Sequence, residues 1–253
     1  MRLTFLGTGT SNGVPVIGCE CAVCRSSDPR DKRQRTAALV ETNTTRILID
    51  CGPDIRCQLL PLPFKKLDAV LLTHAHYDHV GGIDDLRPFC KFGDVDVFAN
   101  REAVAAVRHN FPYCFEEHLY PGVPRLALHT LHAGEPFQVG DVHVLPVEVM
   151  HDRLPILGYR FGNTAYITDM KSIDHEQSKL LKGVETLVVN GLRWEKKHHS
   201  HMLIPEAVDF ARSIGAKHTY IIHVTHDIGL HDVANARLPE GFEIPYDGMS
   251  IEC

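Results

Sequence analysis

The amino-acid sequence predicts an α/β protein of the α+β type, a four-layer αββα sandwich in which two β-sheets face each other and helices cover their outer sides. Two observations support this fold class. Short apolar runs of strand length alternate with helix-like segments, and runs with strand character stand near both ends of the chain. No repeat, low-complexity tract or Ser/Gly-rich linker interrupts the sequence. We therefore expect residues 1–253 to form a single domain.

The predicted strands are short apolar runs bounded by turn-forming or polar residues. Asn43 and Thr44 separate two such runs and predict a hairpin, while Gly52 and Pro53 predict that a strand ends and a helix begins. The runs that we assign as strands are 3–6, 37–40, 46–49, 67–72, 95–98, 142–149, 158–161, 165–167, 186–189 and 219–224.

Two stretches predict helices most clearly. Asn100 can cap a helix over 100–109, and Pro205 suits the first turn of a helix over 205–214. Residues 110–136 are the least regular part of the chain, because they are rich in proline and glycine. We expect this stretch to be a surface insertion near a site or an interface.

The composition is that of an ordinary globular protein, with 44% hydrophobic and 23% charged residues. The formal net charge of −6 disfavours bulk binding of nucleic acid, which would need a local basic patch. No apolar stretch is long enough for a signal peptide or a membrane span. We therefore expect a cytoplasmic protein that does not bind membranes.

The 17 histidines stand out, because imidazole is the commonest protein ligand of metals. His74, His76, Asp78 and His79 directly follow a predicted buried strand. Alternate residues at a strand end share a face, so His74 and His76 can point to one place while the following turn brings Asp78 and His79 to a second. Nitrogen and carboxylate ligands suit zinc, manganese or iron. The cluster therefore predicts two adjacent metal sites.

This HxHxDH pattern resembles the signature of the metallo-β-lactamase superfamily, and the resemblance implies the fold of that name. Three polar residues downstream each close a predicted strand, as the resemblance requires: His151, Asp169 and His223. The resemblance assigns three residues to one metal, namely His74, His76 and His151. It assigns three others to the second metal, namely Asp78, His79 and His223. Asp169 would bridge both metals.

The same resemblance implies two divalent ions, Zn²⁺ or Mn²⁺, with a bridging hydroxide as nucleophile. Asp50 matches another strand-end aspartate of the family, and we expect it to orient a ligand. Asp78 and His201 are the expected catalytic residues. His201 matches a family histidine that contacts the phosphate or protonates the leaving group, and we assign it the role of general acid.

Three cysteines crowd into one tight loop at about 18–25, namely Cys19, Cys21 and Cys24. In a reducing compartment such a cluster favours metal over disulfides. A closed structural zinc site takes four ligands, so one must come from elsewhere. His226, three residues after His223, is our candidate for the fourth ligand of a structural Zn²⁺.

The cysteine loop, the glycine-rich stretch from Gly7 to Pro15 and the closing stretch from Tyr246 to Met249 together resemble the PhnP group of cyclic phosphodiesterases, which has an accessory zinc site of three cysteines and one histidine. The resemblance implies a small phosphodiester substrate, cyclic or linear, and a homodimer. Two alternatives stay open. One is a nuclease that processes tRNA or other RNA 3′ ends, which the lack of a basic Gly/Pro-rich arm disfavours. The other is a scaffold subunit that holds metal without catalysis.

Overall fold

The computed structural model describes residues 1–253 except 117 and 119. Seven strands form the first sheet: β1 (Arg2–Gly7), β2 (Ala37–Glu41), β3 (Arg46–Ile49), β4 (Ala69–Leu71), β5 (Val95–Ala99), β6 (Leu126–Thr130) and β14 (Ser250–Glu252). Seven form the second: β7 (Phe137–Val139), β8 (Val142–His151), β9 (Leu154–Phe161), β10 (Thr164–Ile167), β11 (Thr186–Asn190), β12 (His218–Ile222) and β13 (Phe242–Glu243). The strand orders are β14-β1-β2-β3-β4-β5-β6 and β13-β12-β11-β10-β9-β8-β7.

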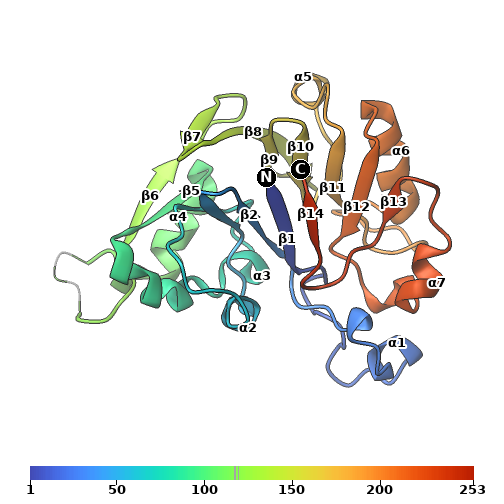
Figure 1. The fold of residues 1–253 in the computed structure, drawn as a ribbon, viewed down its shortest axis with the longest axis horizontal. Helices are drawn as coiled ribbons and strands as arrows, with labels where there is room; N and C mark the ends of the chain where they lie inside the picture. The colour runs from blue at the N-terminus through green and yellow to red at the C-terminus, as the bar shows by residue number, and fades with distance from the viewer. Residues whose placement is uncertain (117, 119) are drawn as a thin grey trace.

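Helices lie on the outer sides of both sheets (Figure 1). The α-helices are α1 (Ala22–Arg25), α2 (Ile55–Leu59), α3 (Tyr77–Val80), α4 (Arg101–Asn110), α5 (His175–Lys179), α6 (Ile204–Ile214) and α7 (His231–Asn235). The 3-10 helices are η1 (Pro29–Asp31), η2 (Ile83–Phe92), η3 (Pro112–Cys114) and η4 (His226–Ile228). Within the described residues, none of these helices combines the length and the apolar character that crossing a membrane requires.

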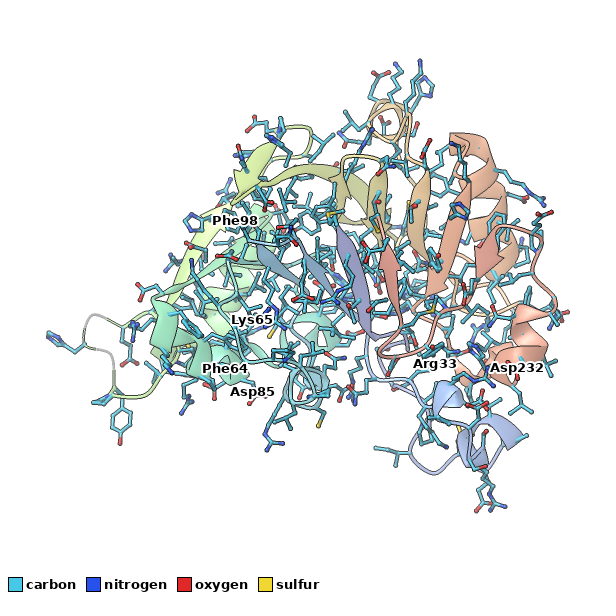
Figure 2. All side chains as sticks on the ribbon, in the orientation of Figure 1. Arg33, Phe64, Lys65, Asp85, Phe98 and Asp232 are labelled. Carbon is cyan, nitrogen blue, oxygen red and sulfur yellow. The ribbon has the colours of Figure 1, made fainter. Side chains whose placement is uncertain are left out.

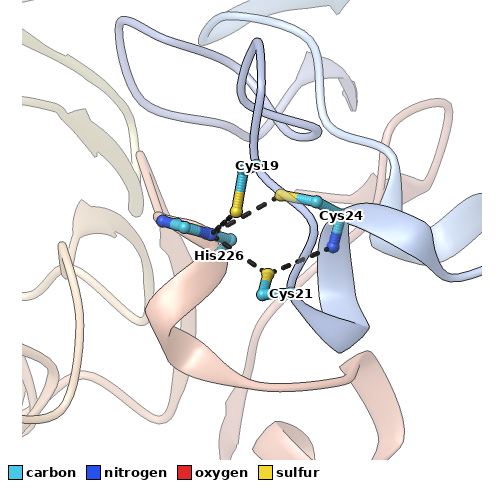
Figure 3. A group of neighbouring side chains, drawn as sticks. All are labelled: Cys19, Cys21, Cys24 and His226. Carbon is cyan, nitrogen blue, oxygen red and sulfur yellow. Dashed lines mark hydrogen bonds between the residues drawn. The ribbon is translucent and has the colours of Figure 1, made fainter.

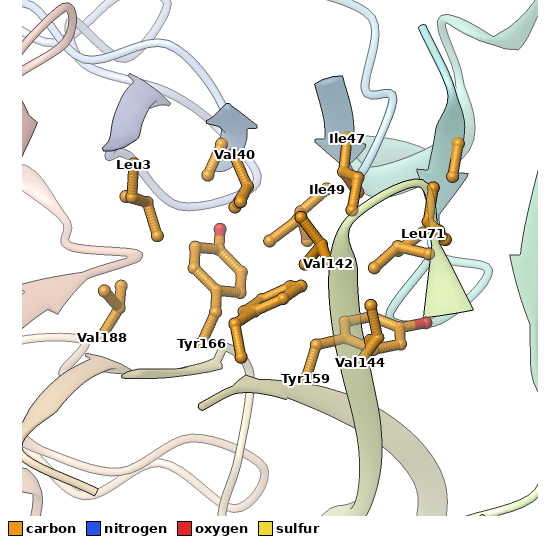
Figure 4. Close-up of a cluster of buried hydrophobic side chains, with 14 of the residues drawn as sticks. Leu3, Val40, Ile47, Ile49, Leu71, Val142, Val144, Tyr159, Tyr166 and Val188 are labelled. Carbon is orange, nitrogen blue, oxygen red and sulfur yellow. The ribbon is translucent and has the colours of Figure 1, made fainter. Parts of the chain in front are cut away.

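The main core lies between the two sheets. Side chains from the first sheet, such as Leu3, Val40 and Ile47, face Tyr166 and Val188 of the second (Figure 4). The intervening residues of the same strands pack on the other side, against the helices of the outer layer. Because both faces of the sheets are buried, the strands read as continuous apolar runs. The four-layer αββα prediction is confirmed.

Most predicted elements appear close to their expected positions. Asn100 caps α4 by accepting a hydrogen bond from the backbone of Ala103, and Pro205 lies in the first turn of α6. The surface insertion predicted over 110–136 is wrong in part, because β6 pairs in parallel with β5 and closes the first sheet. Its burial is only intermediate to low, which explains why it lacks the apolar pattern of the other strands. Residues 117 and 119 of the same stretch lie outside the described residues.

The topology brings several strand ends to one edge of the molecule. Strands β3, β4 and β5 run parallel, and so do β10, β11 and β12. Two hydrogen bonds to backbone carbonyls join the two sheets at this edge. The backbone N–H of Leu157 donates to the carbonyl of Thr73 at 2.9 Å, and the hydroxyl of Tyr159 donates to the carbonyl of Leu72 at 2.5 Å. The polar residues that follow these strands therefore meet between the sheets.

Candidate metal centre

The structure brings the predicted metal ligands together in overlapping groups, in each of which the ligand atoms lie within 4.8 Å of one another. One group is His74, His76 and His151, and another is Asp78, His79 and His223. These are the two sets that the resemblance assigned to two metals. Nε2 of His74 and Nδ1 of His76 lie 3.0 Å apart. Neighbouring nitrogen ligands of one tetrahedral zinc are separated by roughly 3.3 Å, given metal distances of about 2.0 Å.

Asp169 lies between the two groups, where a bridging ligand would stand. Its Oδ1 is 3.1 Å from Nε2 of His223, and its Oδ2 is 3.4 Å from Nε2 of His79. It also groups with His74 and His79, and with His151 and His201. Oδ2 of Asp78 lies 3.3 Å from the same nitrogen of His79. Both carboxylates therefore lie against His79, and Asp169 also groups with His74 of the first set.

Hydrogen bonds on the far side of three histidine rings leave Nε2 free to accept a metal. Nδ1 of His151 donates to the carbonyl of Asp169 at 2.8 Å. Nδ1 of His74 lies 2.9 Å from the hydroxyl of Thr73, and Nδ1 of His79 lies 2.7 Å from Oδ2 of Asp50. An N–H held at Nδ1 makes Nε2 the ring's lone-pair donor. This arrangement is the one that metal-binding histidines use.

Asp50 is placed as predicted, beside a ligand instead of within the ligand groups. It is fully buried, and its carboxylate accepts hydrogen bonds from the backbone and the hydroxyl of Thr73. Burial raises the pKa of Asp50, while His79 acts in the opposite direction. Thr73 links Asp50 to His74, a role that we had not assigned from the sequence. Its position immediately before the HxHxDH motif is the only sequence signal for it.

Three residues at the centre adopt backbone conformations that side-chain-bearing residues seldom use. Asp50, Asp169 and His223 have φ of 63°, 56° and 56°. Asp50 and His223 directly follow β3 and β12, and Asp169 stands two residues after the end of β10, so the chain turns sharply where each side chain enters the centre. A non-glycine residue in this region costs of order 1 kcal/mol. The surrounding sheets hold three such turns together, which is typical of a functional site.

The buried nitrogens of the centre test whether metals fit. Nε2 of His79 and Nε2 of His223 are buried, yet neither has a hydrogen-bond partner among the described residues. Leaving such atoms unsatisfied is costly. Burial acts to lower the pKa of His79, but the carboxylates of Asp169 and Asp50 raise that pKa well above its ordinary value. Burial acts to raise the pKa of Asp169, but the charges of His223 and His79 hold that pKa well below its usual range. Divalent cations at this point would satisfy both nitrogens and carboxylates.

His201 enters the centre from the loop before α6. Its Nε2 lies 2.9 Å from Oδ1 of Asp169, and its ring stacks on that of His223 at 4.8 Å between centroids. Nδ1 of His201 lies 3.0 Å from the hydroxyl of Ser200 and 3.1 Å from Nδ1 of His198. Burial lowers the pKa of His201 to about 4. The ring is therefore neutral near pH 7 and carries one N–H.

The four predicted ligands of the structural zinc also converge (Figure 3). Nδ1 of His226 lies 3.3, 3.2 and 3.5 Å from the sulfurs of Cys19, Cys21 and Cys24. Sulfur and nitrogen ligands of one tetrahedral zinc lie roughly 3.5 Å apart, given metal distances of about 2.3 and 2.0 Å. The backbone N–H of Cys24 holds the pKa of Cys21 down to about 6, which favours the thiolate that binds metal.

Comparisons with known proteins identify the family. Residues 45–224 match the family model described as a Beta-lactamase superfamily domain. The chain therefore belongs to the beta-lactamase superfamily. A crystal structure of a diphosphatase from the PhnP family superposes with a TM-score of 0.91 and 39% identity, covering 99% of this chain and 97% of that one. This similarity confirms the resemblance to the PhnP group. Zn²⁺-bound PqqB from Methylobacterium extorquens shares the fold, with a TM-score of 0.79 and 19% identity over the full length of both chains.

A curated relative from Porphyromonas gingivalis is 46% identical over 250 residues and is named octanoyltransferase. The match covers 98% of this chain but only 51% of that relative, so the chain spans about half the relative's length. The activity in that name belongs to a protein with a further segment of similar size.

Proposed function

We propose that the chain is a metal-dependent hydrolase that cleaves a phosphodiester bond in a small phosphate ester, with cyclic diesters among its substrates. The observation that carries this proposal is a pair of buried nitrogens, Nε2 of His79 and Nε2 of His223, that have no hydrogen-bond partner within the described part of the chain and face the carboxylates of Asp78 and Asp169. Nitrogen and oxygen donors in two adjoining sets suit two divalent cations. The similarity to a PhnP-family diphosphatase supports a phosphorus–oxygen bond as the bond that is cleaved.

In this proposal, His74, His76 and His151 would hold one Zn²⁺ or Mn²⁺. Asp78, His79 and His223 would hold the other, and Asp169 would be shared by the two sets. When bound, such a pair of cations lowers the pKa of water and offsets the negative charge that develops on phosphate. The group of Cys19, Cys21, Cys24 and His226 would hold a third, structural Zn²⁺.

The chain itself contributes positioning and one hydrogen-bond donor. Asp50 and the carbonyl of Asp169 fix the rings of His79 and His151, so these ligands need no rearrangement during the reaction. His201 stands at the edge of the centre with a single N–H at neutral pH. We assign it a hydrogen bond from this N–H to the leaving oxygen, which stabilises the negative charge that develops there as the P–O bond breaks.

The test is a hydrolysis assay with bis-p-nitrophenyl phosphate and ribose cyclic phosphates, on protein loaded with zinc or manganese. We expect turnover by the wild type and none above background by His76→Ala or by metal-stripped protein. Failure on both substrate types would sink the proposal. Cleavage of a precursor tRNA without small-diester activity would favour RNA processing, and equal activity of wild type and His76→Ala would favour a scaffold. The assay also includes an octanoyl thioester, because the longer relative from Porphyromonas gingivalis is named octanoyltransferase.

A further inference from the structure

The loop before α6 carries Ser200 and His201, and its backbone is held from several sides. Side chains of α6 pack against β11 and β12 on the outer side of the second sheet (Figure 2). The backbone N–H of Met202 donates to the carbonyl of Met170 at 3.1 Å, and the carbonyl of Met202 accepts from the N–H of Leu192 at 2.9 Å. The path of the loop is therefore fixed without the side chains of Ser200 and His201.

The hydroxyl of Ser200 lies between two histidine rings. Ser200 is only 4% exposed. Its Oγ lies 3.0 Å from Nδ1 of His201 and 3.2 Å from Nδ1 of His198. The two ring nitrogens are themselves 3.1 Å apart. All three atoms are thus within hydrogen-bond distance of one another, and the positions of their protons decide which bonds form.

The other nitrogen of His201 indicates where that ring carries its proton. Nε2 lies 2.9 Å from Oδ1 of Asp169, and a carboxylate oxygen accepts hydrogen bonds. The single N–H of the neutral ring is therefore on Nε2, directed into the candidate metal centre. Nδ1 is left as an acceptor, and the hydroxyl of Ser200 is the donor that lies nearest to it.

His198 leads the hydroxyl of Ser200 to donate toward His201. If the hydroxyl donated to His198 instead, two bare ring nitrogens would face each other at 3.1 Å. The arrangement that uses every donor is a chain, in which Nδ1 of His198 donates to Oγ and Oγ donates to Nδ1 of His201. The backbone N–H of Ser200, 3.4 Å from Nδ1 of His198, forms the longest of these contacts. Hydrogen bonds in such a chain polarise one another, so the N–H at its end becomes a stronger donor.

We propose that Ser200 is the positioning residue of His201, whose hydroxyl keeps the ring proton on Nε2 and strengthens that N–H as a donor. This inference rests on the proposed function, in which the same N–H meets the leaving oxygen. Stacking on His223 fixes the plane of the ring but not the nitrogen that carries the proton. Asp169 is also a proposed metal ligand, and a carboxylate that shares its charge with a cation attracts a proton less strongly. The donor at Nδ1 then becomes the main determinant of the proton's position.

The first test is Ser200→Ala, which removes the hydroxyl and keeps the backbone. The carbonyl of Ser200 lies 3.1 Å from Nδ1 of the metal ligand His151 and stays in the variant. We therefore expect both active-site metals to remain bound, while kcat for bis-p-nitrophenyl phosphate falls about tenfold at unchanged KM, as for the loss of one hydrogen bond. Ser213→Ala removes an exposed hydroxyl on α6 and should behave like the wild type.

A double variant distinguishes positioning from a general effect on the loop. If Ser200 acts only through His201, its replacement should cost nothing further once His201 is alanine, so the double variant should be as active as His201→Ala alone. Additive losses, full activity of Ser200→Ala, or loss of active-site metal from Ser200→Ala would overturn the proposal.

The position of the proton can also be measured without turnover, which separates this inference from the proposed function. In zinc-loaded protein labelled with ¹⁵N-histidine, we expect Nε2 of His201 to be protonated and Nδ1 to accept a hydrogen bond. The Nδ1 resonance should move to lower field in Ser200→Ala, and His201→Ala identifies the resonances. A proton on Nδ1 in the wild type, or an Nδ1 resonance that is the same in Ser200→Ala, contradicts the role of Ser200 even if diesters are hydrolysed. A wild type without hydrolysis contradicts the proposed function, whatever the position of the proton.

Discussion

Oδ2 of Asp50 lies 2.7 Å from Nδ1 of His79, and both side chains are fully excluded from solvent. The contact keeps the proton of His79 on Nδ1 and leaves Nε2 toward Asp78 and Asp169. A residue that accepts a hydrogen bond from a metal ligand in this way typically changes metal affinity without contacting the metal.

We therefore predict that Asp50→Asn weakens binding of the second active-site metal by about 10 to 100-fold. Asparagine retains an acceptor for His79 but loses the negative charge that makes the ring a stronger donor to a metal. Competition with a chelator, followed by metal analysis, measures the affinity. Asp85→Asn, an exposed aspartate on η2, is the control and should bind metal like the wild type. Equal affinity in the two variants would contradict the assigned role of Asp50.

His201→Ala tests the donor to the leaving oxygen. We predict that kcat for bis-p-nitrophenyl phosphate falls by about 10² to 10³-fold, the range typical of losing one hydrogen-bond donor to a developing oxyanion, while both active-site metals remain bound. His199→Ala is the matched control, because His199 lies in the same loop but is exposed. The assignment fails if the two variants are equally active, or if His201→Ala loses metal in proportion to activity.

Much of this centre could be predicted from the sequence, because each proposed ligand stands at a recognisable place. His74 and His76 follow one apolar run, and His151, Asp169 and His223 each close another. Strand ends of parallel strands meet at one edge, so a pattern of single polar residues after apolar runs carries three-dimensional information.

The features that the sequence did not predict depend on tertiary contacts, which leave no local pattern in the sequence. Thr73 is an ordinary strand-end threonine until Asp50, 23 residues away, accepts its hydrogen bonds. Strand β6 lies in a stretch rich in proline and glycine and is recognised only by its pairing with β5.

Replacing Cys21 tests the structural zinc. The zinc would join residues 19–24 to η4, which are more than 200 residues apart in sequence and contact each other through His226. We predict that Cys21→Ser lowers the metal content by one zinc per chain and leaves the two active-site metals in place, because structural zinc needs all four ligands. Elemental analysis of the purified protein measures this content. Cys57→Ser, an exposed cysteine on α2, should retain all three metals. Three metals in both variants would contradict the site.

Asp247 gives a prediction about pH and stability. Its carboxylate accepts hydrogen bonds from the backbone and hydroxyl of Thr8, at 2.9 and 2.8 Å, and from the backbone of Gln34 at 2.6 Å. Burial nevertheless raises the pKa of Asp247 to about 6, against these hydrogen bonds and the charge of Arg33. In the unfolded chain the group titrates near its ordinary value of about 3.9.

Between roughly pH 4 and pH 6 the folded protein therefore holds a proton that the unfolded chain has released. The free energy of unfolding should fall as pH rises through this window, by at most about 3 kcal/mol from this group. Asp247→Asn removes this titration. As pH rises from 4 to 6, the free energy of unfolding of the wild type should therefore decrease relative to that of the variant. Urea unfolding of both proteins across this range measures the difference, in which the titration of the histidines cancels. If the free energy of unfolding of the wild type stays constant or increases relative to that of the variant, the hydrogen bonds from Thr8 and Gln34 lower the pKa of Asp247 more than burial raises it.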